Sequence, residues 1–506
     1  MPGRGHLNAE EIGSTMDHTS AIDYTDGAVP PDATGDTAHL QGRMGVAELA
    51  LTVLAFAAPL ASVVGVLPLV IIFGGAGAPL AFVAATVVLL LFSVGYTTMS
   101  RYLPNPGAFY AYISAGLGKT VGLASSFLAM LGYMMVGLGI TLFFGIVAHD
   151  TVATTLHGPD LPWWSYCILL VLIVGALGYL RIDLSAKVLS VVMIVEIVIV
   201  LVFDAAVGVK GGPEGLSLEP FTWSAFSQGQ VGVAVLFAVI TFLGFEATAI
   251  FREETKNPRR TVPRATYLGV VCIGAFYILT TWLLIVAYGP SQAPEIANAN
   301  APAMFTDAMQ AFVGTWGRDT INILVVTSAF AAVLSCQNIV ARYGHSLGVD
   351  RALPSALGKV HPRHGSPHVS SLVFTAIFLV GVLVFSRSDP AKTYAWLAGA
   401  GGFPLLLLMF LTSVAVLVFF HRSRTEITDT TSWHTRVAPV LAIIGLGAAL
   451  YLSFTNFTLV TGGDEGIAIA LQVVTWGVFV AGIVLALFFR AKRPETYARI
   501  GRQSLI

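Results

Sequence analysis

The sequence has little of the charge that keeps a protein soluble. Only 11% of its 506 residues are Asp, Glu, Lys or Arg, whereas soluble domains carry about 25%. Hydrophobic residues make up 56% of the chain, and the mean hydropathy is +0.79. The net charge of −1 gives no basic surface for nucleic acid. This composition predicts an integral membrane protein whose partners include the lipid bilayer and exclude nucleic acid.

Signatures of catalytic and metal chemistry are also missing. The three cysteines lie far apart, which excludes a disulfide framework and a CxxC metal pair. No HExxH sequence occurs, and His361, His364 and His368 lie in a Pro- and Gly-containing loop, where solvated histidines are commoner than metal ligands. No GxxxxGK[ST] sequence occurs, so ATP is not expected to be the direct energy source. We expect neither an enzyme nor a bound cofactor or metal.

Long apolar windows fill the chain after its N-terminal tail. Residues 1–42 are rich in Gly, Thr, Asp and Pro and predict a disordered tail without a cleavable signal peptide. A membrane-spanning helix needs about 17 to 25 apolar residues. Twelve windows of suitable length follow, at 46–73, 79–100, 121–148, 163–181, 185–207, 229–251, 265–288, 319–346, 369–387, 393–420, 437–457 and 466–489.

The distribution of basic residues predicts the orientation of these spans. With both termini inside, all but four of the 27 Lys and Arg residues fall on the cytoplasmic side. The exceptions are Lys210, Arg318, Arg387 and Lys392. The positive-inside rule therefore favours twelve spans in the plasma membrane with both ends cytoplasmic.

Two of the spans look interrupted. The first contains Pro59, Gly65 and Pro68, and the sixth contains Gly244 and Glu246. Proline and glycine weaken a helix, and a carboxylate is costly inside an apolar span. The two spans occupy corresponding places in an inverted repeat of five plus five helices, and in such transporters paired interruptions mark the binding site. The alternative is that Pro and Gly only kink or pack these helices. The predicted organisation is a tail at 1–42, a first repeat at 43–207, a second at 208–421, two further spans at 422–490 and a cytoplasmic tail at 491–506.

Three motifs resemble the amino acid-polyamine-organocation (APC) transporters. They are Phe242-Leu243-Gly244-Phe245-Glu246 with the following Glu253 to Pro263, Tyr102 to Tyr112, and Asn338 to Pro354. The resemblance covers residues 43–490 and implies an all-α, LeuT-like fold of twelve helices in which helices 1 and 6 are discontinuous. It also implies that the substrate is an amino acid or a related small amine.

The resemblance and the two breaks together suggest how a zwitterion would bind. Unwinding of span one would free N–H groups beside Ala61, Ser62 and Val63 for a carboxylate. Unwinding of span six would free carbonyls, with Ile240 and Leu243 as candidates, for an ammonium group. Related members carry G-[ST]-G where this chain has Ala61-Ser62-Val63. Phe242 and Tyr133 are candidate gating residues. The predicted substrate-binding residues are Ala61, Ser62, Val63, Ile240, Thr241, Phe242 and Leu243.

We single out two acidic residues inside predicted spans, Glu196 and Glu246, because a carboxylate there costs about 2.5 to 3.5 kcal/mol and usually faces a cavity or a partner. Glu246 resembles a span-six acid linked to proton coupling or gating, or it hydrogen-bonds the span-one backbone and holds the break open. Glu196 stands nine residues after Lys187, where many members of the family place a lysine in the volume of a sodium ion. Glu196 is a proton-coupling acid, a partner for a second amine on the substrate, or a neutral structural acid.

We expect a secondary transporter that moves an amino acid or small amine by alternating access, with Glu196 and Glu246 as the candidate proton-coupling residues. Substrate exchange without net ion coupling is one alternative. Sodium symport is another, with Ser328 and Ser335 as candidate hydroxyls. A channel or ligand-sensing receptor is the alternative of a different class, and it would need a polar pore stripe or a signalling domain that the sequence does not show.

Overall fold

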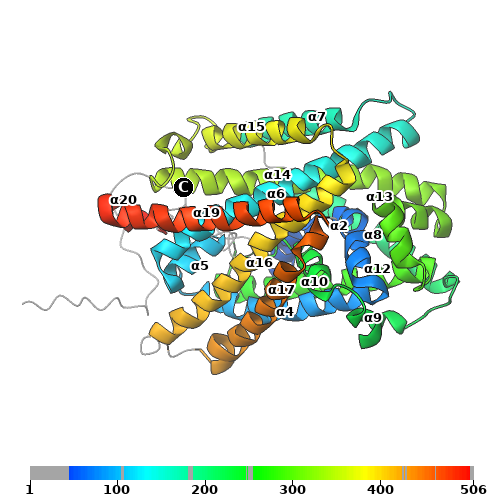
Figure 1. Ribbon diagram of the computed structural model, residues 1–506, viewed down its shortest axis with the longest axis horizontal. Coiled ribbons are helices and arrows are strands. Elements are labelled where there is room, and N and C mark those ends of the chain that lie inside the picture. The colour runs from blue at the N-terminus through cyan, green and yellow to red at the C-terminus, as the bar shows by residue number, and fades with distance from the viewer. Residues whose placement is uncertain are drawn as a thin grey trace, which may run out of the picture. The chain divides into compact units, whose positions relative to one another are not determined.

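The described part of the chain is helical. The computed structural model describes residues 45–103, 108–180, 186–246, 248, 255–423, 427, 430–461 and 463–501, all within one compact unit, Gln41–Ile506. Every regular element in these residues is a helix, as the sequence predicts (Figure 1). The predicted tail at 1–42 lies outside the described residues.

Ten helical stretches in the described residues are long and apolar enough to cross a membrane. They are α4 (Ala78–Met99, preceded by α3, Leu67–Gly74), α6 (Lys119–Asp150), α7 (Trp163–Leu180), α8 (Ala186–Lys210), α12 (Pro258–Tyr288), α14 (Thr315–Val349), α15 (His368–Phe385), α16 (Pro390–Arg422), α17 (Ala438–Thr455) and α19 (Glu465–Lys492).

Spans one and six do not form long helices, as their composition predicts. Span one consists of α1 (Val46–Phe56), α2 (Pro59–Gly65) and α3, and span six begins as α10 (Val231–Ile240) and continues as turns through Glu246. Each piece is too short to cross a bilayer by itself, and α3 also continues into α4 as the stretch Leu67–Met99. The ten long helices together with these two interrupted spans are compatible with the twelve-span layout, which stays a prediction.

The break in span one lies earlier than the sequence suggests. Ala58 adopts a left-handed conformation with φ of 44°, and Pro59 begins α2. A residue before proline is disfavoured in a right-handed helix, and proline itself suits the first helical position. The chain therefore turns at Ala58, and the expectation that it unwinds beside Ser62 and Val63 is wrong, because both lie inside α2.

The interrupted spans lie at the centre of the helix packing. α6 packs against α14 and α16, and α10 packs against α3, α4, α16 and α17. Figure 1 shows α7 beside α15 and α19 beside α6, in agreement with the contacts between these helices. α13 (Ala293–Phe312) packs against α2, α3 and α8. Every residue of α2 is buried.

The C-terminal segment, Pro494–Gly501, contains a short helix, α20 (Pro494–Arg499), and is anchored by hydrogen bonds. The Gly501 N–H donates to the Tyr110 hydroxyl at 2.7 Å, and that hydroxyl donates to Asp350 Oδ2 at 3.2 Å. Tyr110 lies on α5 (Ala108–Leu117), and Asp350 directly follows α14. Ile500 is only 1% exposed. The segment thus joins α5 to the end of α14.

Candidate functional site

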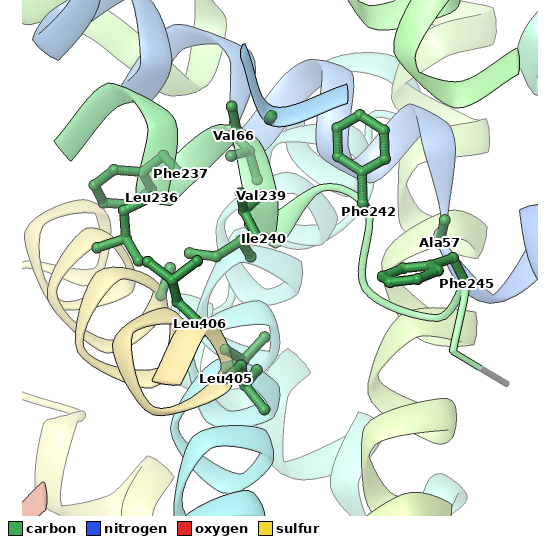
Figure 2. Packing of buried hydrophobic residues seen from close by; sticks show 14 of the residues in the cluster. Ala57, Val66, Leu236, Phe237, Val239, Ile240, Phe242, Phe245, Leu405 and Leu406 are labelled. Atoms are coloured by element: carbon green, nitrogen blue, oxygen red, sulfur yellow. The ribbon is translucent and has the colours of Figure 1, made fainter. Parts of the chain in front are cut away.

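The break in span six is built from tight turns. The N–H groups of Thr241, Phe242 and Leu243 each donate to the carbonyl three residues earlier, at 3.1 to 3.2 Å. Gly244 then adopts φ of 110°, a conformation that side-chain-bearing residues rarely take. Figure 2 shows Phe242 on the irregular stretch beyond α10 and the Phe245 ring close to Ala57. The turn thus brings the two breaks together in a buried region.

Glu246 holds this turn in place. Its Oε2 accepts from the Gly244 N–H at 2.9 Å, and its Oε1 accepts from the Tyr133 hydroxyl on α6. The Tyr96 hydroxyl on α4 donates to the Glu246 carbonyl at 3.1 Å. Glu246 is 4% exposed, and a buried carboxyl group is tolerated when both oxygens have donors. These bonds join span six to α6 and α4. Among the described residues, no hydrogen bond joins the Glu246 carboxyl group to the span-one backbone.

Glu196 occupies a different junction, where α8 meets α2 and α14. Its Oε2 accepts from the Ser328 hydroxyl at 2.9 Å and from the Leu60 N–H at 3.4 Å. The Ala61 N–H donates to the Ser328 hydroxyl oxygen at 3.2 Å. Glu196 is 3% exposed. The first N–H groups of α2, which lack helical partners, are thus bound by an acidic side chain and a hydroxyl group of the protein.

Tyr277 on α12 links the two breaks. Its hydroxyl donates to the Thr241 carbonyl of span six at 3.5 Å, and α12 also packs against α2 of span one. Its ring packs edge-on against Phe242, with 6.1 Å between ring centroids. Phe242 is fully buried, so in this conformation its side chain is not exposed to solvent.

The other predicted binding residues lie around this junction. The Ser62 hydroxyl donates to the Ala57 carbonyl at 3.3 Å, and the Thr241 hydroxyl donates to the Ala238 carbonyl at 2.7 Å. Val63 is fully buried, Ile240 is 8% exposed, and Leu243 is partly buried. The structure therefore brings both breaks and Glu196 together, while the roles of these residues in binding stay predictions.

Three residues at or near this site escaped the sequence argument. Tyr96 and Tyr277 are fully buried tyrosines in apolar helices, and no local pattern separates them from packing residues. Asp204 on α8 is a second buried acid, 3% exposed. A search for every carboxylate inside an apolar window would have found it, because such residues are costly in a membrane.

The Ser335 hydroxyl, one of the two proposed for a sodium site, bonds the Ala331 carbonyl of its own helix at 2.8 Å. In the part of the chain that the structure describes, no three His, Cys, Asp or Glu side chains are grouped as a metal ion requires.

The sequence of nearly the whole helical bundle matches one protein family. The family described as "Amino acid permease" matches residues 50–496. The chain belongs to the amino acid permease family. This permease is therefore a multi-pass membrane protein of a transport family, in agreement with the resemblance seen in its motifs.

Relatives of this permease differ in the substrates that their names give. The branched-chain amino acid permease BcaP of Bacillus subtilis is 26% identical over 359 residues, which cover 68% of this chain and 74% of BcaP. The low-affinity putrescine importer PlaP of Escherichia coli K12 is 26% identical over 316 residues, 60% of this chain and 66% of PlaP. The L-lysine transport protein of Corynebacterium glutamicum is 25% identical over 304 residues, 58% of each chain. All three are transporters and not enzymes.

Proposed function

We propose that this permease is a proton-coupled secondary transporter of an amino acid, working by alternating access. The observation that carries the proposal is the buried Glu196 carboxyl group, which binds the first turn of α2 and Ser328 of α14 at once. Spans one and six, both interrupted, would frame the binding site of a five-plus-five inverted repeat. The charge distribution supports placing both termini in the cytoplasm, with the bundle in the plasma membrane.

Proton binding at Glu196 would control how strongly its carboxyl group binds the first turn of α2. Hydrogen bonds to an ionised carboxylate are roughly twice as strong as those to a neutral group, and the N-terminus of a helix favours a negative charge. Ionised Glu196 therefore binds the Leu60 N–H and the Ser328 hydroxyl tightly. A proton on Glu196 weakens both bonds and loosens α2 from α8 and α14.

The same contact gives a reason for coupling to a substrate carboxylate. The N–H groups at the start of α2 are the donors expected to bind that carboxylate, and Glu196 already bonds one of them. Two negative charges cannot share this helix end without repulsion, so the substrate carboxylate binds best when Glu196 is neutral. Proton and substrate then bind together, as symport requires. This argument favours a carboxylate-bearing amino acid over a diamine that lacks one.

The test is uptake of labelled amino acids and putrescine into sodium-free proteoliposomes, with and without an inward proton gradient. Wild type is compared with Glu196→Gln and with Glu465→Gln, a matched change at an exposed position. We expect the gradient to drive accumulation in the wild type and in Glu465→Gln. Glu196→Gln, which mimics the neutral acid, is expected to lose accumulation and the pH dependence of substrate binding.

Other results would point to the alternatives. Uptake that ignores the proton gradient and requires internal substrate identifies an exchanger. Uptake that appears only with external sodium identifies a sodium symporter. Strong uptake of putrescine, lost in Glu196→Gln, would make Glu196 a partner for a substrate amine. Each of these results refutes the proton-coupling role.

A further inference from the structure

Asp204 is a buried acid on α8 with too few hydrogen-bond donors to stabilise an ionised carboxylate. It is 3% exposed, and its Oδ2 accepts one hydrogen bond, from the Thr280 hydroxyl of α12 at 2.9 Å. Its Oδ1 is buried and has no hydrogen-bond partner among the described residues. An ionised carboxylate with one neutral donor is costly in an apolar interior, whereas the neutral acid is far cheaper to bury.

The position of Asp204 relates it to Glu196. Eight residues separate the two acids on one helix, which corresponds to about 12 Å along the axis. Between them α12 carries Tyr277 and Thr280, three residues apart and so on neighbouring parts of one helix face. Thr280 binds Asp204, and the Tyr277 hydroxyl bonds the Thr241 carbonyl at 3.5 Å. α12 therefore carries a second hydroxyl group about one helical turn before the one that binds Asp204.

No Lys, Arg or His side chain among the described residues forms an ion pair with Asp204. From α12 the group bonded to it is Thr280. From α13, the Phe305 ring packs against the neighbouring Phe203, with 4.8 Å between ring centroids. From α2 and α14, the Leu60 N–H and the Ser328 hydroxyl donate hydrogen bonds to α8, and both bind Glu196. No ion pair involving Asp204 occurs in the part of the chain that the structure describes.

We propose that Asp204 is a second proton-binding site on α8, lying between Glu196 and the end of the helix that packs against α13. The proton binds the carboxylate to give the neutral acid and leaves it, with the carboxylate regenerated, when it passes toward Glu196. Tyr277 and Thr280 each exchange one hydroxyl proton in this path and end unchanged. The relay role rests on the proposed proton coupling, but the binding of a proton by Asp204 does not.

Infrared spectroscopy tests the proton site independently of transport. The C=O stretching band of protonated carboxyl groups is measured for the reconstituted permease in H2O and D2O. We expect Asp204→Asn to remove one component of this band, and Glu196→Gln to leave that component in place. Thr280→Val keeps the carboxyl group and removes its donor, so it should shift the frequency of the same component. An unchanged band in Asp204→Asn, or an unshifted one in Thr280→Val, would overturn the proposal.

Uptake measurements then test the relay. Asp204→Asn should lower gradient-driven uptake by about a hundredfold or more, the scale on which a lost acid-base group acts. Asp204→Glu should restore the pH dependence. If Asp204→Asn loses the band component but takes up substrate as wild type does, the relay role is rejected. If wild-type uptake ignores the gradient, the coupling proposal fails while the infrared result still decides whether Asp204 binds a proton. If Asp204→Asn does not fold, the frequency shift in Thr280→Val decides.

Discussion

Replacing Gly244 with Ala should destabilise the break in span six. Gly244 adopts φ of 110°, where a side chain is strained by about 1 to 3 kcal/mol. Its N–H also donates to the Glu246 carboxyl group at 2.9 Å. A hydrogen bond to a charged group contributes about 1.5 to 3 kcal/mol, and a backbone shift that relieves the strain would lengthen this bond. We therefore expect a loss of roughly 3 kcal/mol.

The control for this change is Gly269→Ala on α12. Gly269 lies inside a helix, and a Cβ added there meets nothing within 4 Å. Alanine at a helical position is about 1 kcal/mol more favourable than glycine. Thermal unfolding of the purified protein in detergent should show Gly244→Ala below wild type and Gly269→Ala at or above it. Equal unfolding temperatures for the two variants would refute the argument that Gly244 fixes the turn.

Two further predictions follow from buried side chains on other elements. Tyr133→Phe removes the donor to Glu246 Oε1, so it should cost about 1 to 3 kcal/mol of stability and reduce uptake. The control is Tyr343→Phe, because the Tyr343 hydroxyl has no hydrogen-bond partner among the described residues. This change should alter neither stability nor uptake. Equal effects of the two changes would show that the hydrogen bond from Tyr133 to Glu246 has no specific role. Burial raises the pKa of Asp350 from the usual 3.8 to about 6, against the hydrogen bonds from Tyr110 and the Gly501 N–H and the positive charges of Arg499 and Lys119. The folded state therefore holds the Asp350 proton more tightly than the unfolded chain does, and the stability that this proton contributes should be present near pH 4 and lost as the pH rises to about 6. Thermal unfolding of the purified protein across this pH range should show the loss in wild type, and a smaller one in Asp350→Asn.

Much of the fold was predictable because the responsible forces are local. Apolar windows long enough to span a bilayer report on each segment by itself. Pro59 and Gly244 weaken helices wherever they occur, and the Glu246 carboxylate is costly inside an apolar span, so both interruptions could be predicted without tertiary information. The exact position of the first break was harder, because Pro59 and Pro68 flank several residues that each could have left the helix. The left-handed conformation of Ala58 places the break at this residue.

The candidate site was predictable only in outline. Glu196 and Glu246 stood out as carboxylates in apolar windows, and Phe242 stood out because it lies in a break. Asp204 passed unnoticed, although the same test applies to it. Tyr96 and Tyr277 could not be distinguished from packing residues, because a buried tyrosine acquires its role from the acceptor that its hydroxyl reaches.

The sequence by itself determined the class of protein, its family and the two segments that cannot form continuous helices. Composition and backbone propensity act along the chain and need no knowledge of neighbours. Only the tertiary structure decided which atoms the buried acids bind. Tyr133 and Glu246 are 113 residues apart, and Leu60 and Glu196 are 136 residues apart. Contacts over such separations depend on how whole helices pack, and in an apolar interior each buried acid must find its partner there or give up its charge.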